Sequence, residues 1–573
     1  MYKFDAIIIG SGLAGLRAAY ELVSNKINTA IISKVYPLRS HSIAAQGGVN
    51  AALANNENAK DDSWEKHACD TIKGSDYLGD QDAILKMCKE GPQRIFELEH
   101  WGCPFSRTDD GRISQRPFGG QGFPRTAYAA DRTGHAMLHT LYEQIIRINE
   151  ENKCLTFFNE WLVTRLIVND KTITGIIALD LKTGNLELFK ADAVIIATGG
   201  AGRLYGKSTN ALINTGIGLS IAYHAGADLK DMEFIQFHPT TLFTTNILIT
   251  EGARGEGGYL LNSAGERFLA NYEDSKKAME IAPRDIVSRN MIREIKKGNA
   301  INGQYLHLDL RHLGKNLIME RLPGVVELAG KFAGINAITE PIPVEPGQHY
   351  TMGGIDTDMD TKTKINGLYA AGEAACVSVH GANRLGGNSL LETVVFGAAA
   401  GEMAGKYIKT NSKSQISNLE CDEALREEEK RISRLFEGEG RENAFNLFEE
   451  LNRIMWENFG IFKEDAQMKA GQKEFKNIKE RSRDLRLRYK GKRFNFELYW
   501  LLEFLGSINI AEAIIAGAIE RAESRGSHYR TDYPKRDDEN WLKHTIASYS
   551  QEGPKLSYKP VALGYVAPAE RKY

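Results

Sequence analysis

The segment Tyr2-Lys3-Phe4-Asp5-Ala6-Ile7-Ile8-Ile9-Gly10-Ser11-Gly12-Leu13-Ala14-Gly15 decides the fold of this chain. It begins with an apolar run that predicts a buried strand, and it ends in the pattern G-x-G-x-x-G. A helix is expected through Leu22, and a second strand over Thr29–Ser33 closes a βαβ unit. In such a unit Gly10 allows the tight turn, Gly12 lets the backbone approach a pyrophosphate, and Gly15 allows close helix packing. Since the pattern lies between a strand and a helix start that attracts phosphate charge, it predicts a dinucleotide-binding fold.

The composition is that of an ordinary globular protein, with 573 residues, 42% hydrophobic residues and a formal net charge of −2. This length predicts two to four domains, and the near-neutral charge argues against a nucleic-acid partner. The six cysteines form no C-x-x-C pair, which argues against a metal site or cluster and indicates a reducing compartment. No stretch approaches 18 apolar residues, so no helix is expected to span a membrane. The N-terminus enters a strand at once, so no signal peptide is expected.

The end of the second strand departs from the usual pattern of this unit. An acidic residue commonly stands there and binds the ribose hydroxyls, but this chain has Ser33-Lys34. A lysine suits a phosphate, and this position alone leaves both FAD and NADP open.

Three later segments favour FAD. Residues 191–197 form a buried strand that runs into Thr198-Gly199-Gly200, and residues 365–374 form another strand that ends near Glu373. With the first unit they resemble the three-part FAD fold of the glutathione reductase superfamily, in which the acidic residue of the last segment faces the sugar part of the flavin. A third glycine segment, 386–391, opens a helix whose start suits the negative charge of the cofactor.

The remaining segments predict the domain organisation. Residues 235–350 have their own turns and strands, residues from about 415 to 525 have a polar helical pattern typical of a solvated bundle, and the tail from Gly526 is irregular. The chain is therefore expected to be α/β. We expect a Rossmann-like FAD-binding domain over 1–234 and 351–410, an inserted α+β capping domain over 235–350, a helical domain over 411–525 and a small C-terminal domain over 526–573.

His41 follows the dinucleotide motif by one strand's length, where an isoalloxazine ring is expected to lie. Its run, residues 39–48, is rich in small and polar residues such as Ser40 and Ser42. A histidine in these surroundings could bond covalently to a flavin.

The inserted segment supplies charged and histidine motifs beside glycines. They are residues 234–240, 250–258, 283–285, 349–354 and 380–387, and Pro283 opens a helix. Two histidines and two arginines beside glycine-rich backbone predict a pocket for an anion with two charged ends, because arginine forks and histidine donors match carboxylates. A flavin on one side and a dicarboxylate on the other would suit hydride transfer at a C–C bond.

These motifs, with residues 39–48, resemble the flavoprotein subunits of succinate dehydrogenase and fumarate reductase (respiratory complex II), and the likeness runs from Met1 to Tyr573. The resemblance implies that His41 is bonded to the 8α carbon of FAD, and that His238, Thr250, His349 and Arg384 hold the substrate carboxylates. It implies that Arg284 exchanges the proton with the substrate carbon, and that Glu251 and Arg254 carry it to solvent. A guanidinium holds its proton well above neutral pH, so Arg284 is expected to act as one link in a relay. The residues expected to contact FAD are Gly10, Gly12, Leu13, Ala14, Gly15, Ser33, Lys34, Ser40, His41, Ser42, Gln46, Gly47, Gly48, Thr198, Gly199, Glu373, Asn388, Ser389 and Leu390.

One position departs from the family, since an aspartate often stands near the flavin where this chain has Ile217. The chain has no cluster ligands and no haem motif, so electrons have no onward path within it. The resemblance implies an iron–sulfur subunit and a membrane anchor with quinone, which hold the chain on the cytoplasmic face of the cell membrane. The charged helical region and residues 525–530 are candidate docking surfaces, with an ordinary solvated face as the alternative.

Two rivals remain open. The soluble relative L-aspartate oxidase has the same fold and a similar pocket, but it binds FAD without a covalent bond and lacks the histidine of the matching loop. A non-catalytic FAD-binding module is the other rival. Gln46 is typical of succinate-oxidising members, although some fumarate reductases share the glutamine, so the expected direction leans to succinate oxidation.

Overall fold

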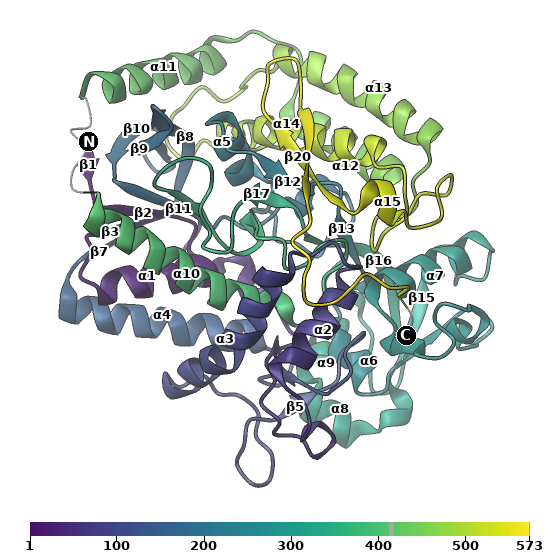
Figure 1. The fold of residues 1–573 in the computed structure, drawn as a ribbon. Helices are drawn as coiled ribbons and strands as arrows, with labels where there is room; N and C mark the ends of the chain where they lie inside the picture. Colours follow the sequence, from purple (N-terminus) through teal and green to yellow (C-terminus); the bar gives the residue numbers. More distant parts are fainter. Residues whose placement is uncertain (412–417, 572–573) are drawn as a thin grey trace.

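The computed structural model describes residues 1–411 and 418–571 of the chain (Figure 1). At its centre lies a five-stranded parallel sheet in the order β18-β11-β2-β3-β7. The strands are short, and β2, β3 and β11 are rich in β-branched residues. Every residue of β2, β3, β11 and β18 is buried. This is the pattern of a parallel sheet covered on both faces. Its strands are β2 (Ala6–Ile9), β3 (Thr29–Ser33), β7 (Leu155–Asn159), β11 (Ala193–Ile196) and β18 (Leu368–Ala370).

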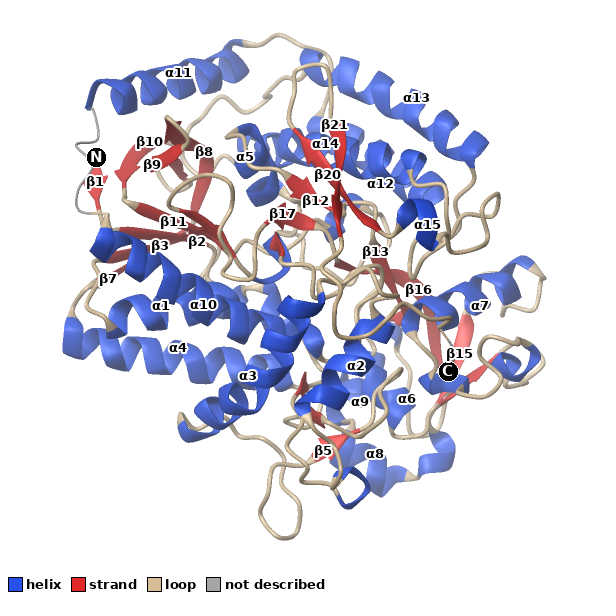
Figure 2. Ribbon diagram, in the orientation of Figure 1, coloured by secondary structure: helices blue, strands red, loops and turns tan. Residues whose placement is uncertain are grey.

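Helices cover one face of this sheet and a second sheet covers the other (Figure 2). The helices are α1 (Leu13–Ser24), α4 (Thr133–Asn152) and α10 (Asn388–Thr410). The second sheet contains β8 (Trp161–Asn169) and β9 (Thr172–Asp180). The expected βαβ unit is confirmed, with α1 two residues longer than the expected end at Leu22.

The turn between β2 and α1 requires its glycines. Gly10 has a φ of +104°, and a side chain there would collide with the carbonyl of Ala197 at the end of β11. A side chain at Gly15 would collide with the carbonyl of Gly10. The turn is therefore packed tightly against the next strand of the sheet, as the G-x-G-x-x-G pattern predicts.

The inserted segment forms a four-stranded antiparallel sheet in the order β13-β16-β15-β14. Its strands are β13 (Ile235–Leu242), β14 (Tyr259–Leu261), β15 (Leu306–Asp309) and β16 (Ile342–Thr351), and the helices α6 (Glu251–Gly255) and α7 (Arg284–Lys296) belong to the same segment. Buried residues from Leu242 to Val344 form an apolar core separate from that of the central sheet. The segment therefore packs as its own unit, which we call the cap.

The C-terminal helices differ from the expected solvated bundle. Three of them, α11 (Asn418–Glu437), α12 (Ala444–Phe459) and α13 (Asp465–Arg481), are amphipathic. The fourth, α14 (Phe496–Glu520), has a mean hydropathy of 1.6, so that by length and composition alone it could cross a membrane. The expectation that no stretch approaches such a length is wrong for α14. Most of this stretch, 72%, is buried inside the protein, where α14 packs against α5 (Ile217–His224) and α12, so it is a central core helix.

The tail also differs from the expected irregular structure. Residues Lys543–Ser548 (β20) and Lys555–Pro560 (β21) form a hairpin that extends a sheet containing β12 (Leu229–Lys230) and β17 (Gly354–Asp356). Through β20 the tail thus pairs with β12, a strand that lies more than 300 residues earlier, which local sequence patterns do not reveal. The proposed boundaries of the four domains stay a prediction.

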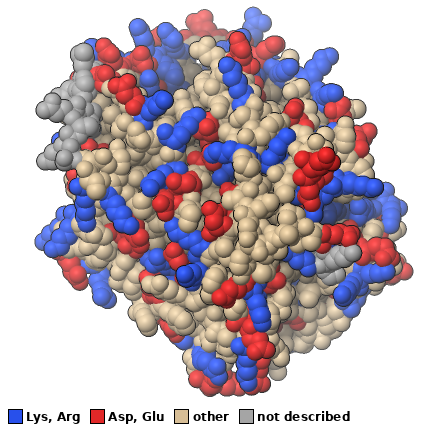
Figure 3. Space-filling view, in the orientation of Figure 1, with Lys and Arg blue, Asp and Glu red and all other residues tan. Residues whose placement is uncertain are grey.

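Charged side chains of both signs are interspersed over the face drawn in Figure 3. This matches the formal net charge of −2, with 72 basic and 74 acidic residues.

Candidate functional site

A cavity of about 470 Å³ lies between the glycine turn of the central sheet and the cap. Nearly all of the catalytic, substrate-binding and cofactor-binding residues expected from the sequence line this cavity. Gly15, Asn388 and Arg254 are the exceptions. Gly15 and Asn388 are next in sequence to lining residues, and Arg254 lies 3.9 Å from the lining residue Glu251. The nominated residues that line the cavity are Gly10, Gly12, Leu13, Ala14, Ser33, Lys34, Ser40, His41, Ser42, Gln46, Gly47, Gly48, Thr198, Gly199, Glu373, Ser389, Leu390, His238, Thr250, Glu251, Arg284, His349 and Arg384.

The sheet side of the cavity fits FAD. Three polar atoms that are buried there, Ser40 Oγ, Gln46 Oε1 and Thr198 Oγ1, have no hydrogen-bond partner among the described residues. A buried polar atom without a partner is costly, so these atoms indicate a polar ligand. Helix α10 also begins at the cavity, and its N-terminal residue before Asn388 is a glycine in the left-handed conformation. A glycine cannot cap the helix with a side chain, which leaves backbone N–H groups for an anion such as a pyrophosphate.

His41 lies at the start of the short helix η2 (His41–Ala44), beside the glycine turn. The next residue, Ser42, accepts a hydrogen bond from the Leu13 N–H at 3.1 Å, which ties the histidine loop to the start of α1. His41 Nδ1 accepts a hydrogen bond from the Ala211 N–H at 3.3 Å. Burial lowers the pKa of His41 to about 4, so the imidazole is neutral. With Nδ1 occupied as an acceptor, Nε2 is the nitrogen available for a bond.

On the cap side, two neutral histidines face each other across adjacent strands. His238 on β13 and His349 on β16 have ring centroids 4.9 Å apart. Burial, together with nearby charged groups including Arg284, holds both pKa values well below the usual range. Thr209 Oγ1 lies 2.8 Å from His349 Nδ1 and fixes the orientation of that ring. The pair therefore offers N–H donors without adding charge.

Arg284 is the first residue of α7, and its guanidinium is fixed on two sides. Its Nε donates to Glu251 Oε2 at 2.6 Å, and its Nη1 donates to Gln236 Oε1 at 3.1 Å. Gly119 N–H donates to the other Glu251 oxygen at 2.8 Å, and Arg254 Nη2 lies 3.9 Å from Oε2. Burial alone would favour a neutral Glu251, but the charges of Arg284 and Arg254 outweigh it and lower the pKa of this carboxyl. The three residues that were expected to form a relay thus meet at the Glu251 carboxylate.

Arg384 points its guanidinium over the Tyr350 ring, with 4.4 Å between Cζ and the ring centroid. Burial and the nearby Arg284 charge lower the pKa of Arg384 to about 9. The Tyr350 hydroxyl donates to Glu392 Oε2 at 2.6 Å, and His380 Nε2 lies 2.9 Å from the same oxygen. Glu392 therefore anchors the residues that orient Arg384.

Sequence reasoning gave no role to Gln236, although it connects the site. Its side-chain amide donates to the Arg384 carbonyl at 2.7 Å while its oxygen accepts from Arg284. One signal could have found it, because Gln236 precedes His238 by two residues on one strand and so shares its face.

Glu373 and Lys34, two further residues that were expected to contact FAD, have different partners in the structure. Glu373 accepts from the Thr351 N–H at 3.0 Å, and burial raises the pKa of Glu373 to about 7. Lys34 Nζ binds Glu503 at 2.8 Å and the Ile213 carbonyl at 2.6 Å.

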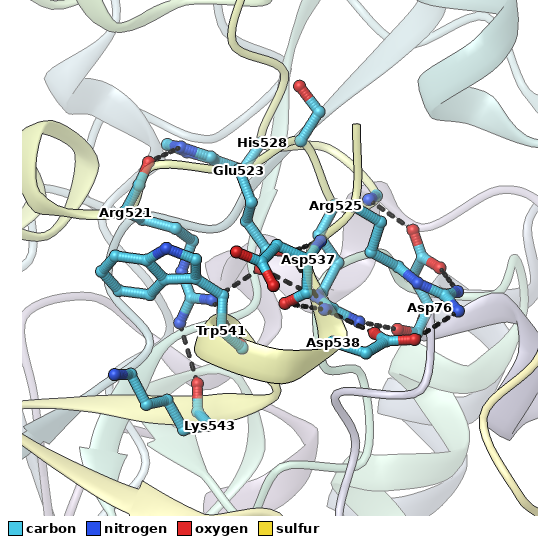
Figure 4. Close-up of polar contacts among 12 residues, drawn as sticks. Asp76, Arg521, Glu523, Arg525, His528, Asp537, Asp538, Trp541 and Lys543 are labelled. Carbon is cyan, nitrogen blue, oxygen red and sulfur yellow. Dashed lines mark hydrogen bonds and ion pairs between the residues drawn. The ribbon is translucent and has the colours of Figure 1, made fainter. Parts of the chain in front are cut away.

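The expected docking surface at residues 525–530 is wrong, because this segment is largely buried within the chain. Arg525 and His528 are 1% and 0% exposed. Figure 4 shows Arg525 between Glu523 and Asp538, and Arg521 beside the Trp541 indole. Arg521 and Arg525 share one oxygen of the buried Glu523, each at 2.8 Å. These charges hold the tail against the core.

The fold and the cavity define an FAD-binding oxidoreductase. The FAD binding domain family matches residues 5–390, and the family described as fumarate reductase flavoprotein C-term matches residues 448–573. The chain is 45% identical to the succinate dehydrogenase flavoprotein subunit of Coxiella burnetii, over 98% of this chain and 96% of the relative. It is 42% identical to the fumarate reductase flavoprotein subunit of Mycobacterium tuberculosis, over 100% and 99%. A solved structure of E. coli quinol fumarate reductase superimposes with a TM-score of 0.94 at 40% identity, over 100% of this chain and 98% of that one.

The chain belongs to the family of succinate dehydrogenase and fumarate reductase flavoprotein subunits. These names establish the oxidoreductase class and cover both directions of the reaction.

Proposed function

We propose that this cavity interconverts succinate and fumarate, with FAD bonded covalently to His41. The observation that carries the proposal is the shared cavity, since His41 faces it from the sheet side and Arg284, His238, His349 and Arg384 face it from the side of the cap and the neighbouring 380–387 loop. The contact of His41 Nδ1 with the Ala211 N–H supports a bond at Nε2, because an imidazole substituted at Nε2 keeps its lone pair on Nδ1.

The substrate side is built to bind two carboxylates. Arg384 supplies a planar fork, and His238, His349 and Thr250 supply neutral donors. Burial strengthens these contacts because water does not compete with them. When bound, FAD supplies the hydride chemistry at the C–C bond.

Arg284 exchanges the proton with the substrate carbon in this proposal. Glu251 keeps the guanidinium charged and correctly turned, and it takes or returns the proton, so Arg284 is neutral only briefly. Arg254, buried behind Glu251, continues the relay toward solvent. The residues expected to contact FAD hold the cofactor in position for this transfer. They are those of the glycine turn and the His41 loop, with Thr198, Gly199, Glu373 and residues 388–390.

L-aspartate oxidase is a weaker alternative. Its amino-acid substrate carries an ammonium group, whereas Glu251, the carboxylate nearest Arg284 in the cavity, is paired with arginines. A non-catalytic FAD module would gain nothing from the buried Arg284–Glu251 pair beside the cavity.

We further propose that electrons leave through an iron–sulfur subunit to a membrane anchor with quinone, and that the chain is peripheral at the cytoplasmic face of the cell membrane. Similarity to quinol fumarate reductase supports this assembly. Gln46 lines the cavity, and its Nε2 donates to the Leu248 carbonyl at 2.9 Å. A glutamine at this position favours succinate oxidation as the direction of the reaction. The test is purification with the partner subunits, followed by assay in both directions with ubiquinone and menaquinone analogues. Turnover of neither succinate nor fumarate would contradict the proposal.

A further inference from the structure

The cofactor cavity lacks an acidic side chain where this fold usually has one. At the end of β3, where a carboxylate commonly binds ribose, the chain has Ser33 and Lys34. Nearby, the α5 helix starts with the apolar Ile217, which lines the same cavity. A carboxylate that contacts both segments comes from a distant part of the chain, on the core helix α14.

That carboxylate belongs to Glu503, whose side chain is 0% exposed. One oxygen accepts from Lys34 Nζ at 2.8 Å, and the other accepts from the Thr215 hydroxyl. Lys34 Nζ also donates to the Ile213 carbonyl at 2.6 Å. Glu503 thus joins the end of β3 to the loop before α5, and both of these segments line the cavity.

Helix α14 packs so closely against the start of α5 that little room is left for a side chain at position 506. A Cβ atom at Gly506 would lie 3.0 to 3.2 Å from atoms of Ile217. One residue further, the Ser507 hydroxyl donates to the Thr215 carbonyl at 2.9 Å. Residues 503, 506 and 507 lie on one face of the helix, because side chains three and four residues apart are neighbours. This face therefore fixes the position of Glu503 against the cavity wall.

We infer that Glu503 is a positioning residue for FAD, which rests on the proposed placement of FAD in this cavity. A lysine ammonium has three N–H donors, and among the described residues Glu503 and the Ile213 carbonyl take two of them. These two contacts orient the ammonium so that its third N–H donates to an oxygen of the adenosine diphosphate part of the cofactor. Glu503 also balances the Lys34 charge, so that the ammonium stays fixed when the cofactor is absent.

The test measures reversible FAD binding in a His41→Ala background, by titration of FAD fluorescence. Glu503→Gln keeps the size of the side chain and removes the charge, and the expected result is a dissociation constant about 10-fold to 100-fold higher. The matched control is Glu512→Gln on the same helix, because Glu512 binds Lys479 at 2.7 Å and lines neither the cavity nor the β3 end. Its expected change is less than twofold.

The double variant Glu503→Gln, Lys34→Met removes both charges and leaves no unpaired buried ion. It must lose FAD affinity to the same extent, and it carries the test if the single variant does not fold. An unchanged dissociation constant in either folded variant, with only the melting temperature lowered, would make the pair purely structural and overturn the inference. Failure of the His41→Ala parent itself to bind FAD would instead contradict the placement of FAD in this cavity.

Discussion

Arg284 and Glu251 form the closest ion pair of the cavity, with Arg284 Nε and Nη2 both 2.6 Å from Glu251 Oε2. Each residue opens a helix of the cap, Arg284 at the start of α7 and Glu251 at the start of α6. Their contact therefore fixes the proposed proton donor relative to the cap rather than to a flexible loop.

Arg284→Lys should keep FAD and lose most turnover. A lysine carries the charge but cannot contact Glu251 and Gln236 at once, and general acid–base catalysis contributes about 10²- to 10⁴-fold. We expect kcat to fall at least about 100-fold, measured by steady-state assay, with unchanged flavin content. Arg289→Lys on the same helix is the control, because Arg289 pairs with Asp285 and does not line the cavity. Near-normal rates in Arg284→Lys would rule out its role.

His41→Ala should abolish covalent flavin. Wild-type protein, once denatured and separated on a gel, should keep a fluorescent flavin band, and the variant should show none. His135→Ala, a change at an exposed histidine on α4, serves as the control and should keep the band. A fluorescent band in denatured His41→Ala would place the bond on another residue.

The contribution of His544 to the free energy of unfolding should decrease as the pH rises above neutral. Burial opposes its protonation, but Asp231 at 2.7 Å and Asp80 at 3.0 Å outweigh that effect and raise the pKa of His544 to about 9. Since the folded pKa is raised, the stabilisation is complete below the unfolded pKa of about 6.5 and is lost as pH rises through 9. The difference in unfolding free energy between wild type and His544→Gln, from urea unfolding, should shrink by about 3 kcal/mol between pH 6 and 9.5. A difference that does not change with pH would contradict a protonated His544.

The tail should stabilise the cap through Arg571. Its Nη2 lies 2.6 Å and 2.7 Å from the two oxygens of Asp285, the second residue of α7, whose side chain is 1% exposed. Arg571→Gln leaves much of that buried charge uncompensated and should lower the free energy of unfolding by about 3 kcal/mol. Lys331→Gln, at the exposed pair with Glu327, should change it by less than about 0.5 kcal/mol. Equal effects of the two substitutions in urea unfolding would contradict this role for Arg571.

The sequence predicted best the features encoded within a few residues. The glycine turn, the strands on either side of it and the start of α7 at Arg284 follow from local pattern, and the structure has them. Gathering the nominated residues into one cavity follows from the family resemblance. Contacts between distant segments could not be predicted, because no local pattern records which partner a side chain meets.

Residues 503 and 525–530 illustrate this limit. Glu503 is one of four glutamates in an otherwise apolar helix, and nothing in the local pattern shows that it contacts Lys34, 469 positions earlier. Residues 525–530 are charged enough to suggest a surface, but Glu523 and Asp538 pair with Arg525 in the interior. Charge alone indicates exposure only when no partner of opposite sign is brought near by the fold.

Anaerobic reduction of the protein-bound flavin by succinate, followed optically, tests the proposed function most directly. We expect succinate to bleach the flavin absorption, fumarate to restore it, and both reactions to be far slower in Arg284→Lys. Bleaching by L-aspartate in place of succinate, or no bleaching by succinate in wild-type protein with its full flavin content, would contradict the proposed function.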